Sequence, residues 1–214
     1  MKVKFAIIIS NTERSIFYLK ALKKNHLLPE KIIYLNDKSK NIYSKLLKKN
    51  NFFFPEITVK KFETNQISNL VAKFLISLKI KYIIYSGYPG KIIKVKNLLR
   101  LKKLLHSHPG KLPEYKGSTS IYYSILKEKR IFCSTLILNN KIDDGKVMCI
   151  KEYSTPNDIY NIDTCYDSKI RAENMIFVIK NLKKLKSINK IKKNSNTYYV
   201  IHPVLRSLVL NKIL

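Results

Sequence analysis

The chain has 214 residues, 45% of them hydrophobic, which is enough to bury the core of one sizeable domain and excludes disorder as the default state. Its 42 lysines and arginines against 14 acidic residues give a formal net charge of +28, which raises the question of a nucleic-acid partner. Only five of these basic residues are arginine, and the lysines are scattered over the whole length. Nucleic-acid-binding surfaces concentrate charge on one element, so a diffuse solvated surface is favoured and nucleic acid is disfavoured.

The cysteines and the first residues indicate the compartment. Cys133, Cys149 and Cys165 have no paired short spacing, which argues against a disulfide framework and against a Cys-x-x-Cys zinc site. A reducing, cytoplasmic location is therefore expected. The apolar run of residues 3–9 is too short for a membrane span and lacks a small-residue cleavage site, so it predicts a first strand.

Along the chain, apolar runs alternate with amphipathic stretches, which is typical of an α/β sheet. The predicted strands cover residues 3–9, 31–35, 82–85 and 101–107, and a hairpin of residues 132–138 and 146–153. The predicted helices cover residues 11–24, 42–49, 65–78 (with Leu70 on the apolar face), 92–98, 117–127 and 156–185. A polar linker over residues 186–197 and an apolar C-terminal docking tail over residues 198–214 are expected to follow. No glycine-rich nucleotide loop and no Gly-x-Ser-x-Gly elbow occurs.

Two segments carry most of the chemical groups. Residues 106–117 read His-Ser-His-Pro-Gly-Lys-Leu-Pro-Glu-Tyr-Lys-Gly, and residues 142–145 read Ile-Asp-Asp-Gly. His106 and His108 lie at the exit of a predicted strand, where a separation of one residue puts both imidazoles on one face. Asp143 lies in the predicted hairpin loop. These groups make a candidate site of two imidazoles and one carboxylate.

The two segments are similar to the signature of the formyltransferases, usually Asn-x-His-x-Ser-x-Leu-Pro-x-x-Arg-Gly and later Leu-Asp-x-Gly. The order, the helix between them and the gap of 35 residues from His108 to Asp143 agree with that family. The resemblance implies a Rossmann-like formyltransferase fold, with a mostly parallel central sheet flanked by helices and a catalytic domain over residues 1–185. It also implies transfer of a formyl group from N10-formyltetrahydrofolate to a primary amine.

The resemblance also implies roles for the site residues. His108 is expected to donate to the oxyanion and to carry a proton, while Asp143 orients it and accepts the amine proton directly or through water. His106 stands where the family normally has asparagine. An imidazole can also donate one hydrogen bond, but it is bulkier and a second partner must fix its tautomer. The alternative that the two histidines and the carboxylate hold a metal is weaker, because the family needs none.

Further binding residues follow from the resemblance and from residue type. The segment of residues 86–92 looks like the family loop that lies against the folate, so the expected donor-binding residues are Ser86, Gly87, Tyr88, Pro89 and Gly90. The residues expected to contact the amine substrate are Arg14, Lys91, Lys116 and Ser118.

The expected substrate is an amino sugar, because the sequence lacks features that are typical of formyltransferases with other substrates. Methionyl-tRNA formyltransferases resemble this core but carry a sizeable C-terminal barrel, whereas the linker and short tail follow residue 185 here. The phosphate loop of the purine-pathway enzymes contains glycine, and residues 10–14 contain none. The remaining candidate substrate is therefore an activated, nucleotide-linked amino sugar for surface polysaccharide. A homodimer is compatible with the sequence. The competing hypothesis is a catalytically impaired formyltransferase-like protein that binds RNA or another polyanion.

Overall fold

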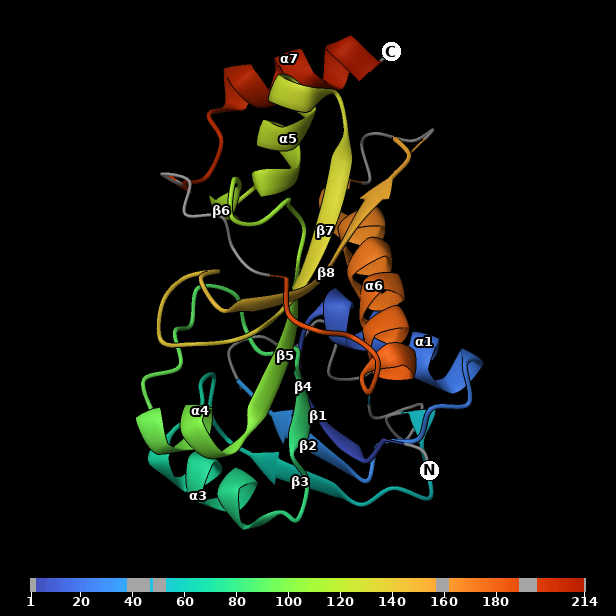
Figure 1. The fold of residues 1–214 in the computed structure, drawn as a ribbon, viewed down its shortest axis with the longest axis vertical. Helices are drawn as coiled ribbons and strands as arrows, with labels where there is room; N and C mark the ends of the chain where they lie inside the picture. Colours follow the sequence, from blue (N-terminus) through green and yellow to red (C-terminus); the bar gives the residue numbers. More distant parts are fainter. Residues whose placement is uncertain (1–2, 38–46, 48–52, 157–161, 189–195, 214) are drawn as a thin grey trace. The chain divides into compact units, whose positions relative to one another are not determined.

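The computed structural model describes residues 3–37, 47, 53–156, 162–188 and 196–213, and its chain forms two compact units, residues 1–106 and 107–214 (Figure 1). Strand β5 (Lys103–His108) passes from the first unit into the second. The helix expected over residues 42–49 lies outside the described residues, apart from residue 47.

The first unit contains a parallel sheet. The strand order is β3-β2-β1-β4-β5, and each of these neighbouring pairs runs parallel. Besides β5, the strands are β1 (Phe5–Ser10), β2 (Lys31–Leu35), β3 (Val59–Phe62) and β4 (Tyr82–Tyr85). All six residues of β1 are buried, as expected for a strand covered on both faces. The predicted α/β fold with a mostly parallel sheet is therefore confirmed.

Helices cover both faces of this sheet. They are α1 (Glu13–Lys24), α3 (Asn69–Ser77) and α4 (Lys96–Leu101). Figure 1 shows α3 and α4 on one side of the strands and α1 on the other. The side chain of Thr12 caps α1 by accepting from the Ser15 amide, as a threonine at this position favours.

Two details of these helices correct the sequence analysis. Leu70 is 68% exposed, because its neighbour Val71 faces the core and adjacent helix positions point in different directions. The helix predicted over residues 92–98 instead begins at Lys96, after an extended Val95.

The second unit is built around the predicted hairpin. Strands β7 (Ile131–Ile137) and β8 (Lys146–Tyr153) pair antiparallel, and β7 follows β5 in the strand order. Helix α6 (Asp167–Asn181) packs on both strands and is preceded by a π-helical turn, η3 (Ile162–Tyr166). Helix α5 (Ser120–Glu128) packs on β7. The helix predicted over residues 156–185 thus ends earlier, at Asn181, and its α-helical part begins at Asp167. Residues 157–161 of that prediction lie outside the described residues.

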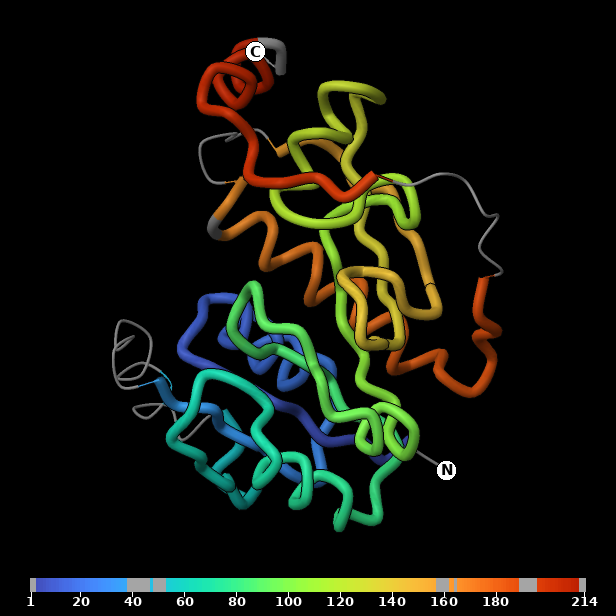
Figure 2. The backbone as a smooth tube through the Cα atoms, turned by 90° about the vertical axis from the view of Figure 1, so that its left-hand side faces the viewer, coloured from blue at the N-terminus to red at the C-terminus, as the bar shows by residue number. Residues whose placement is uncertain are grey.

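The C-terminal tail adds two elements that the sequence analysis did not predict. Strand β9 (Thr197–Tyr198) pairs parallel with β6 (Lys116–Gly117), and helix α7 (Pro203–Ile213) contacts α5. Figure 2 shows this segment, in red, running beside the yellow-green chain that leads into α5. Its Ile201 and Val209 are buried in the same hydrophobic cluster as residues of α5.

The described residues also bear on the membrane and cysteine expectations. Within them, no helix is both long and apolar enough to cross a bilayer. Cys133 and Cys149 are buried, whereas Cys165 is exposed. Burial raises the pKa of Cys133 to about 12 and also raises the pKa of Cys149.

Candidate active site

The structure brings His108 and Asp143 together. His108 is the last residue of β5, and its side chain is only 3% exposed. Its Nδ1 lies 3.4 Å from the Asp143 carboxylate, and its Nε2 lies 2.6 Å from the Tyr115 carbonyl oxygen. Because a carbonyl oxygen only accepts, the neutral imidazole carries its proton on Nε2 and presents Nδ1 to Asp143. Nδ1 and the Asp143 carboxylate are then two facing acceptors, so a hydrogen bond joins them only when a proton lies between them.

The surroundings favour the neutral form of this imidazole. Burial is the largest influence and lowers the pKa of His108; the Asp143 carboxylate opposes this, and the Arg171 guanidinium adds to it. The Asp143 side chain is 14% exposed, so it is the more accessible member of the pair. The arrangement is a solvent-reachable carboxylate backed by a buried neutral imidazole, which suits proton transfer.

The hairpin loop places Asp143 by its backbone. Asp143 has φ +45°, in the left-handed region that aspartate tolerates better than most residues. Its Oδ2 accepts a 3.0 Å hydrogen bond from the Gly117 amide. Two residues on, a Cβ at Gly145 would overlap the Ile137 carbonyl oxygen, so only glycine lets the loop pass this close to β7. The Asp-x-Gly spacing thus has a geometric reason.

Three residues of this site were missed by the sequence analysis. Arg171 of α6 donates from Nη1 to the Ser107 carbonyl at 2.9 Å and from Nε to Asp167 at 2.8 Å. It therefore holds the end of β5 next to His108. The i,i+4 spacing of Asp167 and Arg171 was a usable signal. Tyr115 acts through its carbonyl oxygen, and a backbone acceptor leaves no mark in sequence.

The predicted donor loop after β4 divides into a fixed part and an exposed part. The Ser86 carbonyl accepts from the hydroxyls of Ser10 (2.8 Å) and Ser15 (3.1 Å). The Tyr88 hydroxyl accepts from the amides of Asn11 (3.3 Å) and Asp37 (3.0 Å).

Arg14 completes the fixed part by donating to the Gly87 carbonyl and, at 3.4 Å, to the Ser86 hydroxyl. Ser86, Gly87 and Tyr88 are buried, whereas Pro89 and Gly90 are exposed. The exposed end of the loop is therefore the part that can meet a ligand.

His106, the residue in the family's asparagine position, lies half-buried on β5 beside Tyr85. Its Nδ1 is 3.3 Å from the Tyr85 carbonyl oxygen, and the two rings are 6.1 Å apart. Since the carbonyl accepts, the neutral ring has its proton on Nδ1, and Nε2 is then an acceptor. A neutral His106 in this tautomer does not replace the amide N–H of asparagine at Nε2.

The residues predicted to contact the amine substrate have different environments. Arg14 serves the loop after β4, as described above. Lys116 binds Asp144 at 2.7 Å, with a side chain that is 14% exposed. Lys91 and Ser118 are exposed.

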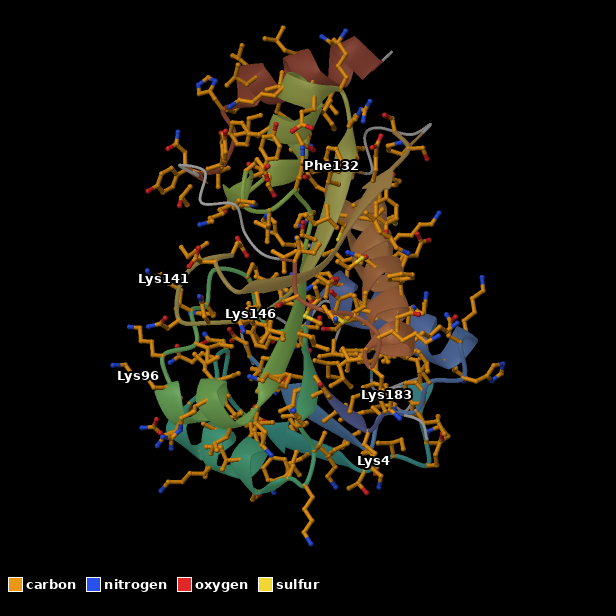
Figure 3. All side chains as sticks on the ribbon, viewed as in Figure 1. Lys4, Lys96, Phe132, Lys141, Lys146 and Lys183 are labelled. Carbon is orange, nitrogen blue, oxygen red and sulfur yellow. The ribbon has the colours of Figure 1, made fainter. Side chains whose placement is uncertain are left out.

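The positions of the lysines bear on the hypothesis of a nucleic-acid surface, and those of the acidic groups bear on the hypothesis of a metal site. Figure 3 labels Lys4, Lys96, Lys141, Lys146 and Lys183, which are exposed and come from different segments of the chain. Within the described residues, no group of three histidine, cysteine, aspartate or glutamate side chains is arranged to hold a metal ion.

Comparison with known proteins agrees with the signature. No protein-family model matches the chain. Over 105 residues it is 30% identical to the methionyl-tRNA formyltransferase of Finegoldia magna, a match that covers 48% of this chain. The match spans about a third (32%) of that curated relative's length.

Solved structures match nearly the whole chain. A sugar N-formyltransferase from Shewanella superposes with a TM-score of 0.64 at 13% identity, over 97% of this chain and 86% of that one. An N-formyltransferase from Helicobacter canadensis, in complex with folinic acid and dTDP-3-aminofucose, gives 0.60 at 18% identity, over 92% and 71%. A phosphoribosylglycinamide formyltransferase from Anaplasma phagocytophilum gives 0.60 at 12% identity, over 94% and 100%. Together these matches confirm the resemblance to the formyltransferases and show that the chain has their fold.

Proposed function

From a chain with the formyltransferase fold, we propose an N-formyltransferase that moves the formyl group of N10-formyltetrahydrofolate to the primary amine of a nucleotide-linked amino sugar. The observation that carries this proposal is the contact between the buried His108 imidazole and the partly exposed Asp143 carboxylate. The sugar substrate is supported by the likeness to sugar N-formyltransferases over nearly the whole chain. A role in surface polysaccharide synthesis would follow from that substrate.

The pair meets the main chemical need of formyl transfer. When an amine attacks the formyl carbon, the new C–N bond leaves a positive charge on nitrogen, and a proton must depart. Asp143 is the accessible acceptor, and His108 can share that proton at Nδ1 while Nε2–H stays bonded to Tyr115. Positioned acid–base groups of this kind contribute about 10²–10⁴-fold in rate.

The oxygen of the formyl group needs a hydrogen-bond donor as negative charge develops on it. The sequence analysis gave this role to His108, but its Nε2–H is directed to the Tyr115 carbonyl. We therefore assign His108 to sharing, at Nδ1, the proton that Asp143 accepts. In its Nδ1–H tautomer, His106 can donate from Nε2 only when protonated.

The exposed end of the loop after β4 is where we place the formyl donor. Pro89, Gly90 and Ile92 are exposed there, and Ile92 is 45% exposed despite being apolar. Small-molecule sites are lined mainly by apolar side chains, which Pro89 and Ile92 supply at this end of the loop. In this proposal Ser86, Gly87 and Tyr88 shape the loop, and Pro89 and Gly90 contact the ligand.

A turnover assay tests the proposal. Purified full-length protein is given N10-formyltetrahydrofolate and a panel of amines: amino-sugar nucleotides, glycinamide ribonucleotide and methionyl-tRNA. We expect turnover with at least one amino-sugar nucleotide. Asp143→Asn should keep the fold and lose about 10²-fold or more in kcat. Near-normal turnover of that variant would remove Asp143 from the mechanism, and transfer to methionyl-tRNA alone would overturn the sugar substrate.

The net charge of +28 favours one second candidate, an inactive relative that binds RNA or another polyanion. This second candidate predicts different results in the assays. No amine in the panel would be formylated, and the affinity for RNA would fall steeply as salt rises.

A further inference from the structure

We propose that Tyr198, in the C-terminal tail, is a positioning residue for the His108–Asp143 pair. It contacts both residues whose backbone groups hold that pair, although its sequence position is far from either. The kinetic part of this inference rests on the proposed function, whereas the structural part does not.

The first connection runs through Tyr115 to His108. The Tyr115 carbonyl oxygen accepts the His108 Nε2–H at 2.6 Å. The Tyr115 ring lies against the Tyr198 ring, with centroids 5.7 Å apart. Loss of the Tyr198 ring would leave an open volume beside Tyr115, and the backbone that fixes the His108 imidazole would gain freedom.

The second connection runs through Gly117 to Asp143. The Gly117 amide donates to Asp143 Oδ2 at 3.0 Å. Gly117 pairs with Tyr198 in the β6–β9 ladder, and the next amide, that of Ser118, donates to the Tyr198 carbonyl at 2.9 Å. Gly117 has φ +98°, and a Cβ there would overlap that carbonyl oxygen. The tail strand and the amide that binds the carboxylate are thus in direct van der Waals contact.

The ring of Tyr198 is what keeps this short ladder in place. It lies 4.5 Å, centroid to centroid, from the Tyr123 ring, and its hydroxyl accepts from Lys127 at 2.7 Å. A ladder of two residues per strand has little stability of its own, so side-chain packing must supply it. The Tyr198 side chain makes that packing with α5 on one side and with Tyr115 on the other.

The rest of the tail has separate anchors, so a change at Tyr198 need not release it. The Ile201 amide donates to the Thr119 hydroxyl at 2.9 Å. Arg206 donates to Tyr122 at 3.1 Å and to Asp163 at 2.9 Å. Because these contacts do not involve Tyr198, its substitution should act locally on the ladder and the pair.

Kinetics of three tail variants test the inference. Tyr198→Ala should lower kcat about ten- to hundred-fold with KM for the formyl donor unchanged, because misplacement of a catalytic group by about 1 Å costs this much. Tyr198→Phe keeps the ring and should restore kcat. Tyr199→Ala is the matched control, since Tyr199 is 79% exposed. Equal effects of Tyr198→Ala and Tyr199→Ala would overturn the inference.

An NMR experiment separates this inference from the proposed function. In the full-length protein, the His108 imidazole is followed through a pH titration and the Gly117 amide through hydrogen exchange. Tyr198→Ala should shift the His108 titration and speed Gly117 exchange, while Tyr199→Ala leaves both unchanged. This result would hold even if no amine were formylated. An unchanged titration and unchanged exchange in Tyr198→Ala would refute the positioning role whatever the enzyme assay gives.

Discussion

The loop after β4 and the loop after β5 both follow the carboxyl ends of parallel strands, yet they are fixed in different ways. Residues 86–88 are held by hydroxyls and an arginine from β1 and the start of α1. Those supports belong to the first unit. Residues 115–118 are held by β9, a two-residue strand of the C-terminal tail.

The difference implies that the two loops differ in local stability. The β1 and α1 groups are in place whenever the sheet is formed, so the first loop shares the stability of the first unit. The second loop depends instead on a tail segment that pairs with it over only two residues. Local opening is therefore expected in the tail before the sheet.

Matched glycine substitutions should give the largest contrast. Gly117→Ala puts a Cβ onto the Tyr198 carbonyl at φ +98°, so the β6–β9 ladder must separate, and we expect near-complete loss of transfer activity. Gly90→Ala meets open space and pays only for its φ of +71°, about 1–2 kcal/mol. Urea unfolding and turnover of both variants measure the contrast. Retained activity in Gly117→Ala would show that β9 is dispensable.

Removal of one hydroxyl should destabilise the first loop by a smaller amount. The Ser15 hydroxyl accepts from the Ser10 amide at 3.0 Å and donates to the buried Ser86 carbonyl. Ser15→Ala leaves that amide short of a partner, so the free energy of unfolding should fall by about 1–3 kcal/mol. Denaturant unfolding gives the value. The His108 titration serves as control, and we expect it to be unaltered.

The pH dependence of stability near neutral pH should report on the second loop through His108. Burial lowers the pKa of His108 in the folded state, whereas the unfolded chain takes up this proton near pH 6.5. The unfolded state thus binds more protons as pH falls below about 6.5, and the stability present above that pH is progressively lost. His108→Gln should flatten this part of the curve. An identical pH dependence in the variant would assign the effect to other groups.

The smallest expected effect is a gain. His106→Asn can keep a hydrogen bond to the Tyr85 carbonyl and adds a second amide N–H, so we expect kcat to rise several-fold at neutral pH. His106→Ala, which has neither group, should lower it. A fall in kcat in the asparagine variant would mean that the imidazole supplies something an amide cannot.

Sequence patterns predicted the sheet better than the contacts that hold the loops. Strand β2 was predicted with its observed bounds, because a short apolar run between polar residues leaves few options. Strand β3 was missed: its Lys60 and Lys61 are exposed, which hides the pattern of an edge strand. Strands β6 and β9 are too short for any periodicity and exist only through their pairing.

The candidate site was predictable in the same uneven way. The motif predicted that His108 and Asp143 share one site, and the structure places them in contact. The Tyr115 carbonyl and the Gly117 amide could not be predicted, because every residue carries a carbonyl and every residue except proline an amide N–H. Tertiary structure alone decides which of these groups are used. The catalytic roles of His106, His108 and Asp143 and the domain boundaries stay predictions.

The cysteines offer a practical consequence. The Cys133 and Cys149 thiols are buried and held protonated, so thiol-reactive reagents should leave them unmodified in the folded protein. Cys165 is exposed and lies two residues from Asp163, the partner of Arg206 in α7. A fluorophore on this native cysteine would need no engineered attachment point, and its emission would follow the undocking of the tail in real time.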